Sequence, residues 1–176
     1  MLTMQINLRI RYYGDPCLRK KCKVVARVTD RERAILKEMR EVMCTSGGIG
    51  LAAPQVGLDK QMLIVDVGEG LVSLINPKLE KKSGAEFWEE GCLSLPGINV
   101  KVKRAKKIEV SGLDENGHKV NITAYDLFAC ALQHEMDHLK GKLIIDYASL
   151  FQKMKFKKRL KSLRGGRCGL PKSETQ

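Results

Sequence analysis

The sequence has no long apolar run, since its longest purely apolar stretch, residues 127–132, ends after six residues. A helix that crosses a bilayer needs about 20 apolar residues, so we expect no membrane-spanning segment. The first ten residues alternate apolar and polar side chains and include no apolar core of a secretory signal. They therefore predict a strand rather than an export signal, and the expected location is the cytoplasm.

Disulfide bonds are not expected either, although the chain contains six cysteines. Without an export signal these thiols face a reducing compartment, where free thiols, metal ligands or catalytic groups are the usual forms. Histidine is scarce, with three residues in the whole chain. A histidine pair at a functional spacing therefore rarely arises here by chance.

The size and composition suit one globular domain, with 176 residues of which 43% are hydrophobic and 30% charged. No internal repeat or low-complexity segment divides the chain. We expect a single domain over residues 1–165. The paired glycines at 165 and 166 mark the boundary, and residues 166–176 are expected to form a basic flexible tail.

Positive charge is concentrated towards the C-terminus. The formal net charge is +12, and residues 148–176 hold nine Lys or Arg against one Glu, which leaves +8 there and +4 elsewhere. The apolar residues between Leu150 and Leu163 follow helical spacing, so this segment predicts a basic helix. Such a helix either contacts a polyanion or forms a solvated face. It contains no motif that reads bases, so sequence-specific nucleic-acid binding is not expected.

Strand pairs and separate helices alternate along the chain. Thr29 is expected to cap an amphipathic helix over residues 31–43. The other expected elements are strands at 61–67, 71–79, 98–102, 106–113 and 118–125, and a helix over 126–140 that ends at Gly141. Hairpins with segregated helices predict an α+β fold.

The segment from His134 to His138 reads H-E-M-D-H within the expected helix. Two histidines four positions apart lie on one helix face, close enough for both imidazoles to bind one ion. Glu135, one position further round, can reach a water on such an ion without itself binding the metal. The third histidine, His118, follows a hairpin turn and is expected at the surface.

A catalytic metal site normally has three protein ligands and one open position. No histidine follows His138, but upstream the segment E-G-C-L-S at residues 90–94 presents Cys92 in a glycine-containing loop. A thiolate binds Zn²⁺ or Fe²⁺ strongly, although a lone cysteine is more often a small buried side chain. Glu90 and Arg104 could pair to steady this loop or form a surface ion pair of little consequence.

A third segment, G-I-G-L-A-A-P-Q at residues 48–55, places two closely spaced glycines before Gln55. Glycines let a backbone approach a bound substrate closely, and a glutamine amide can donate a hydrogen bond to a developing oxyanion. A generic turn is the alternative. A phosphate-binding loop is excluded because no Gly-Lys-Ser/Thr follows.

In this order and spacing, the three segments resemble the three motifs of the peptide deformylase family. The resemblance runs from about residue 6 to about residue 151. It implies one α+β domain with antiparallel β-sheets around a central helix that carries the H-E-x-x-H motif, and a C-terminal helix. The implied activity removes the formyl group from the initiator methionine of nascent polypeptides, giving formate and a free N-terminal methionine.

The resemblance also implies a role for each residue of the site. Cys92, His134 and His138 would bind one divalent metal ion, natively Fe²⁺, with Zn²⁺ or Ni²⁺ as substitutes. Glu135 would serve as general base and then general acid. The oxyanion would be held by the metal, the side chain of Gln55 and the backbone N–H of Leu93.

Substrate binding is implied for two groups of residues. Gly48, Ile49 and Gly50 would make strand-like contacts with the nascent peptide. Ile49, Leu127 and Cys130 would line an apolar pocket for the methionine side chain, although Leu127 and Cys130 also suit a core. Because formylated chains emerge from ribosomes, the basic C-terminal helix could contact ribosomal RNA.

Two other interpretations stay open. An H-E-x-x-H zinc endopeptidase normally needs a further downstream ligand, which this sequence lacks. An RNA- or ribosome-binding protein with a structural metal would normally close its site with four protein ligands, whereas the motifs supply three. The identity of the metal also stays open, because one cysteine and two histidines suit both Fe²⁺ and Zn²⁺.

Overall fold

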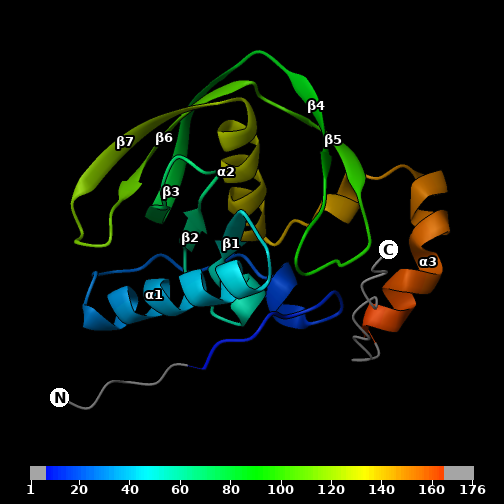
Figure 1. The fold of residues 1–176 in the computed structure, drawn as a ribbon, viewed down its shortest axis with the longest axis horizontal. Helices are drawn as coiled ribbons and strands as arrows, with labels where there is room; N and C mark the ends of the chain where they lie inside the picture. Colours follow the sequence, from blue (N-terminus) through cyan, green and yellow to red (C-terminus); the bar gives the residue numbers. More distant parts are fainter. Residues whose placement is uncertain (1–6, 165–176) are drawn as a thin grey trace.

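A computed structural model describes residues 7–164 of the chain (Figure 1). Its helices are α1 (Asp30–Thr45), α2 (Asp126–His138) and α3 (Leu150–Arg164), together with the short 3₁₀ helices η1 (Pro16–Arg19), η2 (Ala53–Val56) and η3 (Ile144–Asp146). Its strands are β1 (Gly50–Ala52), β2 (Met62–Val65), β3 (Val72–Ser83), β4 (Glu86–Glu90), β5 (Val100–Arg104), β6 (Lys107–Leu113) and β7 (Lys119–Tyr125).

The strands form two antiparallel sheets, one of five strands in the order β1-β2-β3-β6-β7 and one of β4 and β5. Helix α2 stands between the five-stranded sheet and the β4–β5 pair, while α3 lies beyond that pair (Figure 1). This arrangement confirms the expected α+β fold with a central helix and a C-terminal helix. No helix within residues 7–164 is long and apolar enough to cross a bilayer.

Strand β2 separates the two main parts of the core. Its four residues, M-L-I-V, are all buried, and alternate side chains point to opposite faces of a strand. Leu63 and Val65 pack in the cluster that includes Leu132 of α2, whereas Met62 and Ile64 pack in the cluster of α1. The five-stranded sheet therefore holds α2 on one face and α1 on the other.

Helix α1 starts as the sequence predicts. The Thr29 side chain accepts a hydrogen bond from the Arg31 N–H, and the Glu32 carboxylate accepts one from the Thr29 N–H, so both ends of a capping box are present. Helix α2 ends at His138, two residues earlier than expected. Gly141 follows with φ +73°, and a Cβ there would lie 2.5 Å from the Arg19 carbonyl oxygen.

The N-terminal strand prediction is wrong for the part that the structure describes. Residues 7–12 form no strand, because the backbone there bonds to η2 and to the loop after β4 instead of to one neighbouring strand. The N–H of Arg11 donates to the Gln55 carbonyl and the N–H of Tyr13 donates to the Ser94 carbonyl. The expected tail at residues 166–176 lies outside the described residues.

Five cysteines lie within the described residues, and all five are free. The sixth, Cys168, lies outside them. His118 is exposed as expected, with its ring 3.5 Å from the carboxylate of Asp114.

Candidate metal centre and substrate cavity

Three potential ligand atoms converge where α2 meets the loop after β4. The Cys92 sulfur lies 3.3 Å from His138 Nε2, which lies 3.2 Å from His134 Nε2. All three atoms fall within 4.8 Å of one another. One thiol and two imidazoles form a donor set that suits Zn²⁺ or Fe²⁺. The helix supplies the histidines at its own repeat, and the loop brings the cysteine from 46 residues away.

Unpartnered polar atoms around this cluster indicate that it is built for an ion. Within residues 7–164, Oε2 of Glu135 and Nδ1 of His138 are buried without a hydrogen-bond partner. Buried polar atoms are nearly always paired, so an orphaned carboxylate oxygen beside converging ligands fits a site that holds a metal and a water. The residues present therefore fit one divalent ion.

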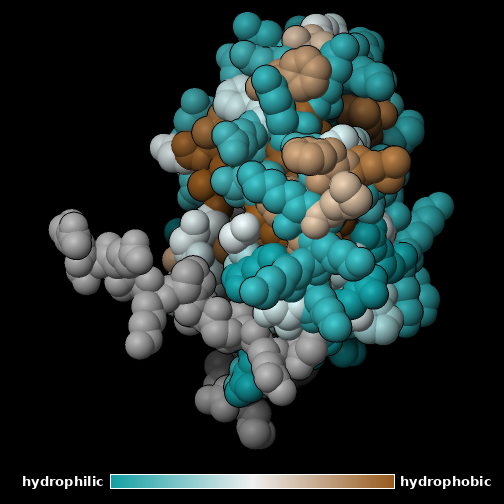
Figure 2. All heavy atoms as spheres, turned by 90° about the vertical axis from the view of Figure 1, so that its right-hand side faces the viewer, coloured by the Kyte–Doolittle hydropathy of each residue, from teal (hydrophilic) through white to brown (hydrophobic). Residues whose placement is uncertain are grey.

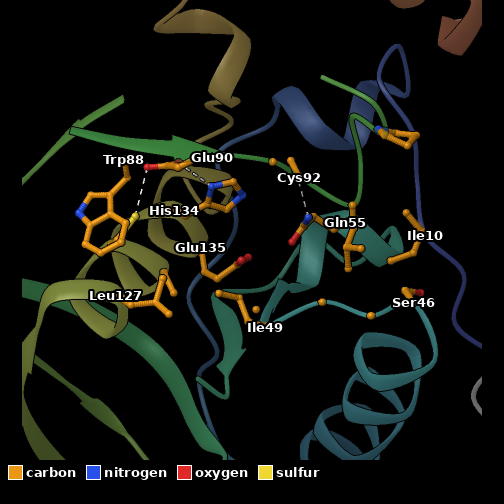
Figure 3. Close-up of a pocket in the computed structure, with 18 of the residues that line it drawn as sticks. Ile10, Ser46, Ile49, Gln55, Trp88, Glu90, Cys92, Leu127, His134 and Glu135 are labelled. Atoms are coloured by element: carbon orange, nitrogen blue, oxygen red, sulfur yellow. Dashed lines mark hydrogen bonds and ion pairs between the residues drawn. The ribbon is translucent and has the colours of Figure 1, made fainter. Parts of the chain in front are cut away.

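Glu90 orients the first histidine of the helix. Its Oε2 lies 2.9 Å from Nδ1 of His134. A carboxylate only accepts hydrogen bonds, so Nδ1 carries the proton and Nε2 keeps its lone pair towards Cys92 and His138. Figure 3 shows the Glu90 carboxylate beside the His134 ring, joined to it by a dashed line.

The Glu90–Arg104 pair is buried, so the surface alternative considered for it is wrong. The guanidinium donates to both carboxylate oxygens of Glu90, at 2.7 and 2.9 Å. The two side chains are only 5% and 4% exposed. Burial alone would raise the pKa of Glu90, but hydrogen bonds from Arg104 and His134 outweigh it and lower that pKa to about 2. Glu90 therefore stays ionised at neutral pH.

The two remaining ionisable groups of α2 at this site have perturbed pKa values. Burial raises the pKa of Glu135 to about 7, so its carboxyl can both accept and return a proton near neutral pH. Burial lowers the pKa of His138 well below its ordinary value. A neutral His138 is the form that binds a metal.

Gln55 lies in η2 with its amide turned towards the Cys92 loop (Figure 3). Its Oε1 accepts a hydrogen bond from the Ala52 N–H at 2.7 Å, which fixes the orientation of the amide. Its Nε2 then lies 3.5 Å from the Cys92 sulfur and 3.4 Å from the Ser94 hydroxyl. The distance to Ser94 is long for a hydrogen bond between nitrogen and oxygen, so this N–H₂ can also donate to a substrate.

Neither Gly48 nor Gly50 has a positive φ, so the backbone conformation does not require glycine at these positions. Close packing does require it. A Cβ at Gly50 would clash with the carboxylate of Glu135, and a Cβ at Gly48 would lie 2.7 Å from Cδ1 of Leu93. The two glycines thus let this segment approach both α2 and the Cys92 loop. The cavity wall forms where these segments meet.

A cavity of about 720 Å³ opens in front of the ligand cluster and is lined by all the residues expected to bind substrate, namely Gly48, Ile49, Gly50, Leu127 and Cys130. Gln55, Cys92, Leu93, His134 and Glu135 also line it. Ile49 and Leu127 are 47% and 41% exposed because their side chains face this space (Figure 3). Cys130 is buried in the wall, where its thiol donates to Glu90 at 3.4 Å and burial raises its pKa to about 12.

Sequence reasoning missed the part played by Trp88, the single tryptophan of the chain, which also lines the cavity. Trp88 and Glu90 are two positions apart on β4, so they share one face of the strand. The same alternation on β5 places Arg104 with the buried Val100 and Val102. Reading these periodicities could have assigned Trp88 to the cavity and Arg104 to the interior.

Comparison with known proteins gives a consistent result. The family model described as polypeptide deformylase matches residues 7–154. A peptide deformylase from Syntrophomonas wolfei is 50% identical over 131 residues, which cover 74% of this chain and 86% of that protein. One from Halothermothrix orenii is 48% identical over 141 residues, covering 79% and 92% respectively.

Solved structures agree with the sequence relatives. A peptide deformylase from Legionella pneumophila superposes with a TM-score of 0.86 at 34% identity, covering 93% of this chain and 99% of that one. A second, from Synechococcus elongatus in complex with actinonin, gives 0.83 at 39% identity, covering 89% and 88%. The chain therefore belongs to the polypeptide deformylase family, metal-dependent hydrolases that remove the N-formyl group from nascent peptides.

Proposed function

We propose that Cys92, His134 and His138 hold the divalent ion of this deformylase and that Fe²⁺ is its native metal, with Zn²⁺ and Ni²⁺ as substitutes. The observation that carries the proposal is the convergence of these three ligand atoms beside the orphaned carboxylate oxygen of Glu135. A divalent ion in such a site supplies Lewis acidity and lowers the pKa of water from 15.7 to about 7.

Glu135 is proposed to move the protons of the reaction. A carboxyl with a pKa of about 7 can take a proton from the attacking water and later give it to the departing amine. Expelling an unprotonated amine is unfavourable, so this return of the proton is needed for the C–N bond to break. The burial that raises the pKa of Glu135 also keeps bulk water from competing for that proton.

Gln55 and Leu93 are proposed to stabilise the oxyanion of the formyl group. The Nε2 of Gln55 is aimed at the ligand cluster, and within residues 7–164 the Leu93 N–H donates no hydrogen bond. Preorganised donors of this kind contribute about 3–4 kcal/mol each to the transition state. Because Ala52 fixes the Gln55 amide, little reorganisation is required when the charge develops.

The substrate is proposed to lie along the glycine segment with its methionine side chain in the cavity. Gly48, Ile49 and Gly50 line the cavity, and Ile49, Leu127 and Cys130 give its wall an apolar character. Methionine suits such a pocket because its flexible thioether adapts to irregular apolar surfaces.

The decisive experiment measures formate release from a formyl-Met tripeptide by protein purified anaerobically with Fe²⁺. Glu135→Gln should retain metal and lose nearly all turnover, whereas Glu115→Gln, a change of the same kind at an exposed hairpin residue, should match the parent. Full activity in Glu135→Gln would refute the proton-transfer role. Cleavage of casein at internal bonds would instead support the endopeptidase alternative.

We also propose that the protein works in the cytoplasm and that α3 contacts ribosomal RNA. The helix contains no acidic residue, and Lys155, Lys157, Lys158 and Lys161 are exposed on it. Figure 2, viewed from the α3 side, shows a mostly hydrophilic face with scattered apolar groups. Lysines on such a face can release counterions from RNA phosphates.

The contact can be tested by reversing charge on this helix while keeping its packed residues. Lys155, Lys158 and Lys161 changed together to Glu should abolish co-sedimentation with ribosomes at low salt. The control reverses three exposed cations of α1, at Arg31, Lys37 and Arg40, and should co-sediment as the parent does. Unchanged co-sedimentation of the α3 variant would refute the contact and leave a solvated face.

A further inference from the structure

A continuous chain of polar contacts runs from the candidate metal ligand His134 to a tyrosine near the start of α3. Beyond the Glu90–Arg104 pair, Nη1 of Arg104 donates to Oδ2 of Asp137 at 2.6 Å. The hydroxyl of Tyr147 donates to the same oxygen at 2.7 Å. None of Arg104, Asp137 and Tyr147 lines the substrate cavity. They do not contact a substrate there, and their hydrogen bonds reach the candidate metal ligand His134 through Glu90.

The geometry of the chain makes Arg104 depend on both of its carboxylates. Its guanidinium is 4% exposed and shares its donors between Glu90 on one side and Asp137 on the other. A buried charge is tolerated only when it is fully paired and hydrogen-bonded. Glu90 in turn can hold His134 in one orientation only while Arg104 stays in place. Asp137 therefore acts on the His134 imidazole through two intervening side chains, those of Arg104 and Glu90.

Tyr147 lies at the end of this chain of polar contacts that is farthest from His134. Its ring centroid lies 5.1 Å from the Arg104 guanidinium carbon, and its hydroxyl fixes the Asp137 carboxylate. Burial raises the pKa of Tyr147 to about 12, and its hydrogen bond to Asp137 raises it too, so the hydroxyl remains a donor at neutral pH. Tyr147 lies between η3 and α3, so this contact ties the start of the C-terminal helix to the network.

We propose that Asp137 and Tyr147 are positioning residues that, through Arg104 and Glu90, fix the His134 imidazole for metal binding. The inference rests on the metal site of the proposed function. Groups that orient a ligating histidine typically change metal affinity or activity 10–100-fold when they are altered, which is about the effect expected for Asp137. Tyr147 is one contact further away, so its effect should be smaller.

The test follows loss of Co²⁺ from loaded protein to an excess of chelator, together with the visible spectrum of the Co²⁺ protein. Asp137→Asn should release the ion about 10–100-fold faster than the parent, and Tyr147→Phe about 3–10-fold faster, both with altered spectra. Tyr125→Phe is the matched control, since Tyr125 is exposed on β7 and its ring lies beside the Lys107 ammonium, as the Tyr147 ring lies beside Arg104. Its release rate and spectrum should equal those of the parent.

Thermal unfolding of the metal-free variants separates positioning from general stability. Tyr147→Phe keeps the ring over Arg104, so its midpoint should stay close to that of Tyr125→Phe while its release rate differs. Parent-like release and spectra in both Asp137→Asn and Tyr147→Phe would overturn the proposal. So would faster release that merely follows a lowered unfolding midpoint.

The same measurements distinguish this inference from the proposed function. A parent that binds Co²⁺ but releases no formate when loaded with Fe²⁺ would refute the proposed reaction, while the release rates would still decide the role of the two residues. A parent that binds no Co²⁺ at all would overturn both.

Discussion

Glu32 and Glu90 are two buried carboxylates whose pKa values are lowered in the same way but which serve different parts of the molecule. Each is about 5% exposed, at 4% and 6%, and in each case hydrogen bonds outweigh the effect of burial and lower the pKa to about 2. Glu32 pairs with Lys60 and the cap residue Thr29 at the start of α1. Glu90 pairs with Arg104 and with a candidate metal ligand, His134.

The partners explain why the two sites should respond differently to mutation. The Lys60 side chain is 29% exposed, so its ammonium can turn towards water if Glu32 is lost, whereas Arg104 is 4% exposed and has no such escape. The Glu32 network ends on a helix cap, and the Glu90 network ends on the candidate metal centre. A similar pKa shift therefore indicates local stability in one place and function in the other.

Glu90→Gln should give the largest effect. It leaves Arg104 with one carboxylate instead of two and removes the charge that fixes His134, so we expect a loss of about 3 kcal/mol in unfolding free energy. Metal affinity should fall about 10–100-fold. Urea unfolding and metal titration measure the two quantities. Unchanged metal affinity would contradict the role given to Glu90.

Glu32→Gln should lower stability without changing the reaction. Loss of the Lys60 and Thr29 interactions should cost about 2 kcal/mol near neutral pH, less than at Glu90 because Lys60 can be resolvated. Formate release by the folded variant should equal that of the parent, and Glu41→Gln on the exposed side of α1 is the control. A drop in turnover would show that Glu32 also affects the reaction, and the contrast with Glu90 would then be wrong.

The difference in unfolding free energy between the parent and Glu32→Gln should depend on pH. The pKa of Glu32 is about 2 in the folded chain against 4.5 as its ordinary value. Its contribution is therefore complete above pH 4.5 and is lost as the pH falls towards 2. Urea midpoints of the two metal-free proteins should converge between about pH 4.5 and pH 2. A constant gap would show that Glu32 acts by packing instead of charge.

Removing an exposed ion pair should give the smallest change in stability of the substitutions compared. Lys81 and Glu109 face each other across β3 and β6 at 3.1 Å, with side chains 76% and 37% exposed. Lys81→Ala should change the unfolding free energy by less than about 0.5 kcal/mol. A larger loss in urea unfolding would mean that exposure does not separate weak pairs from strong ones in this fold.

Several parts of the fold and site were predictable because they depend on local spacing. The Thr29 cap, the hairpin of β6 and β7, and the two histidines of α2 each follow from backbone geometry over a few residues. The N-terminal strand failed for the opposite reason. Alternation in residues 7–12 is a local signal, but a strand also needs a neighbouring strand to pair with, and there the backbone bonds to η2 and to the loop after β4.

The sequence by itself determined the central helix, the histidine pair on one of its faces and the three motifs that identify the family. Only the tertiary structure decided that Arg104 is buried between Glu90 and Asp137, that Gly50 packs on Glu135, and that Tyr147 reaches the same network. Periodicity places a side chain on a face of its own element. What that face meets depends on how the β4–β5 pair and the segment before α3 pack around α2, and long-range contacts of this kind leave no local pattern to read.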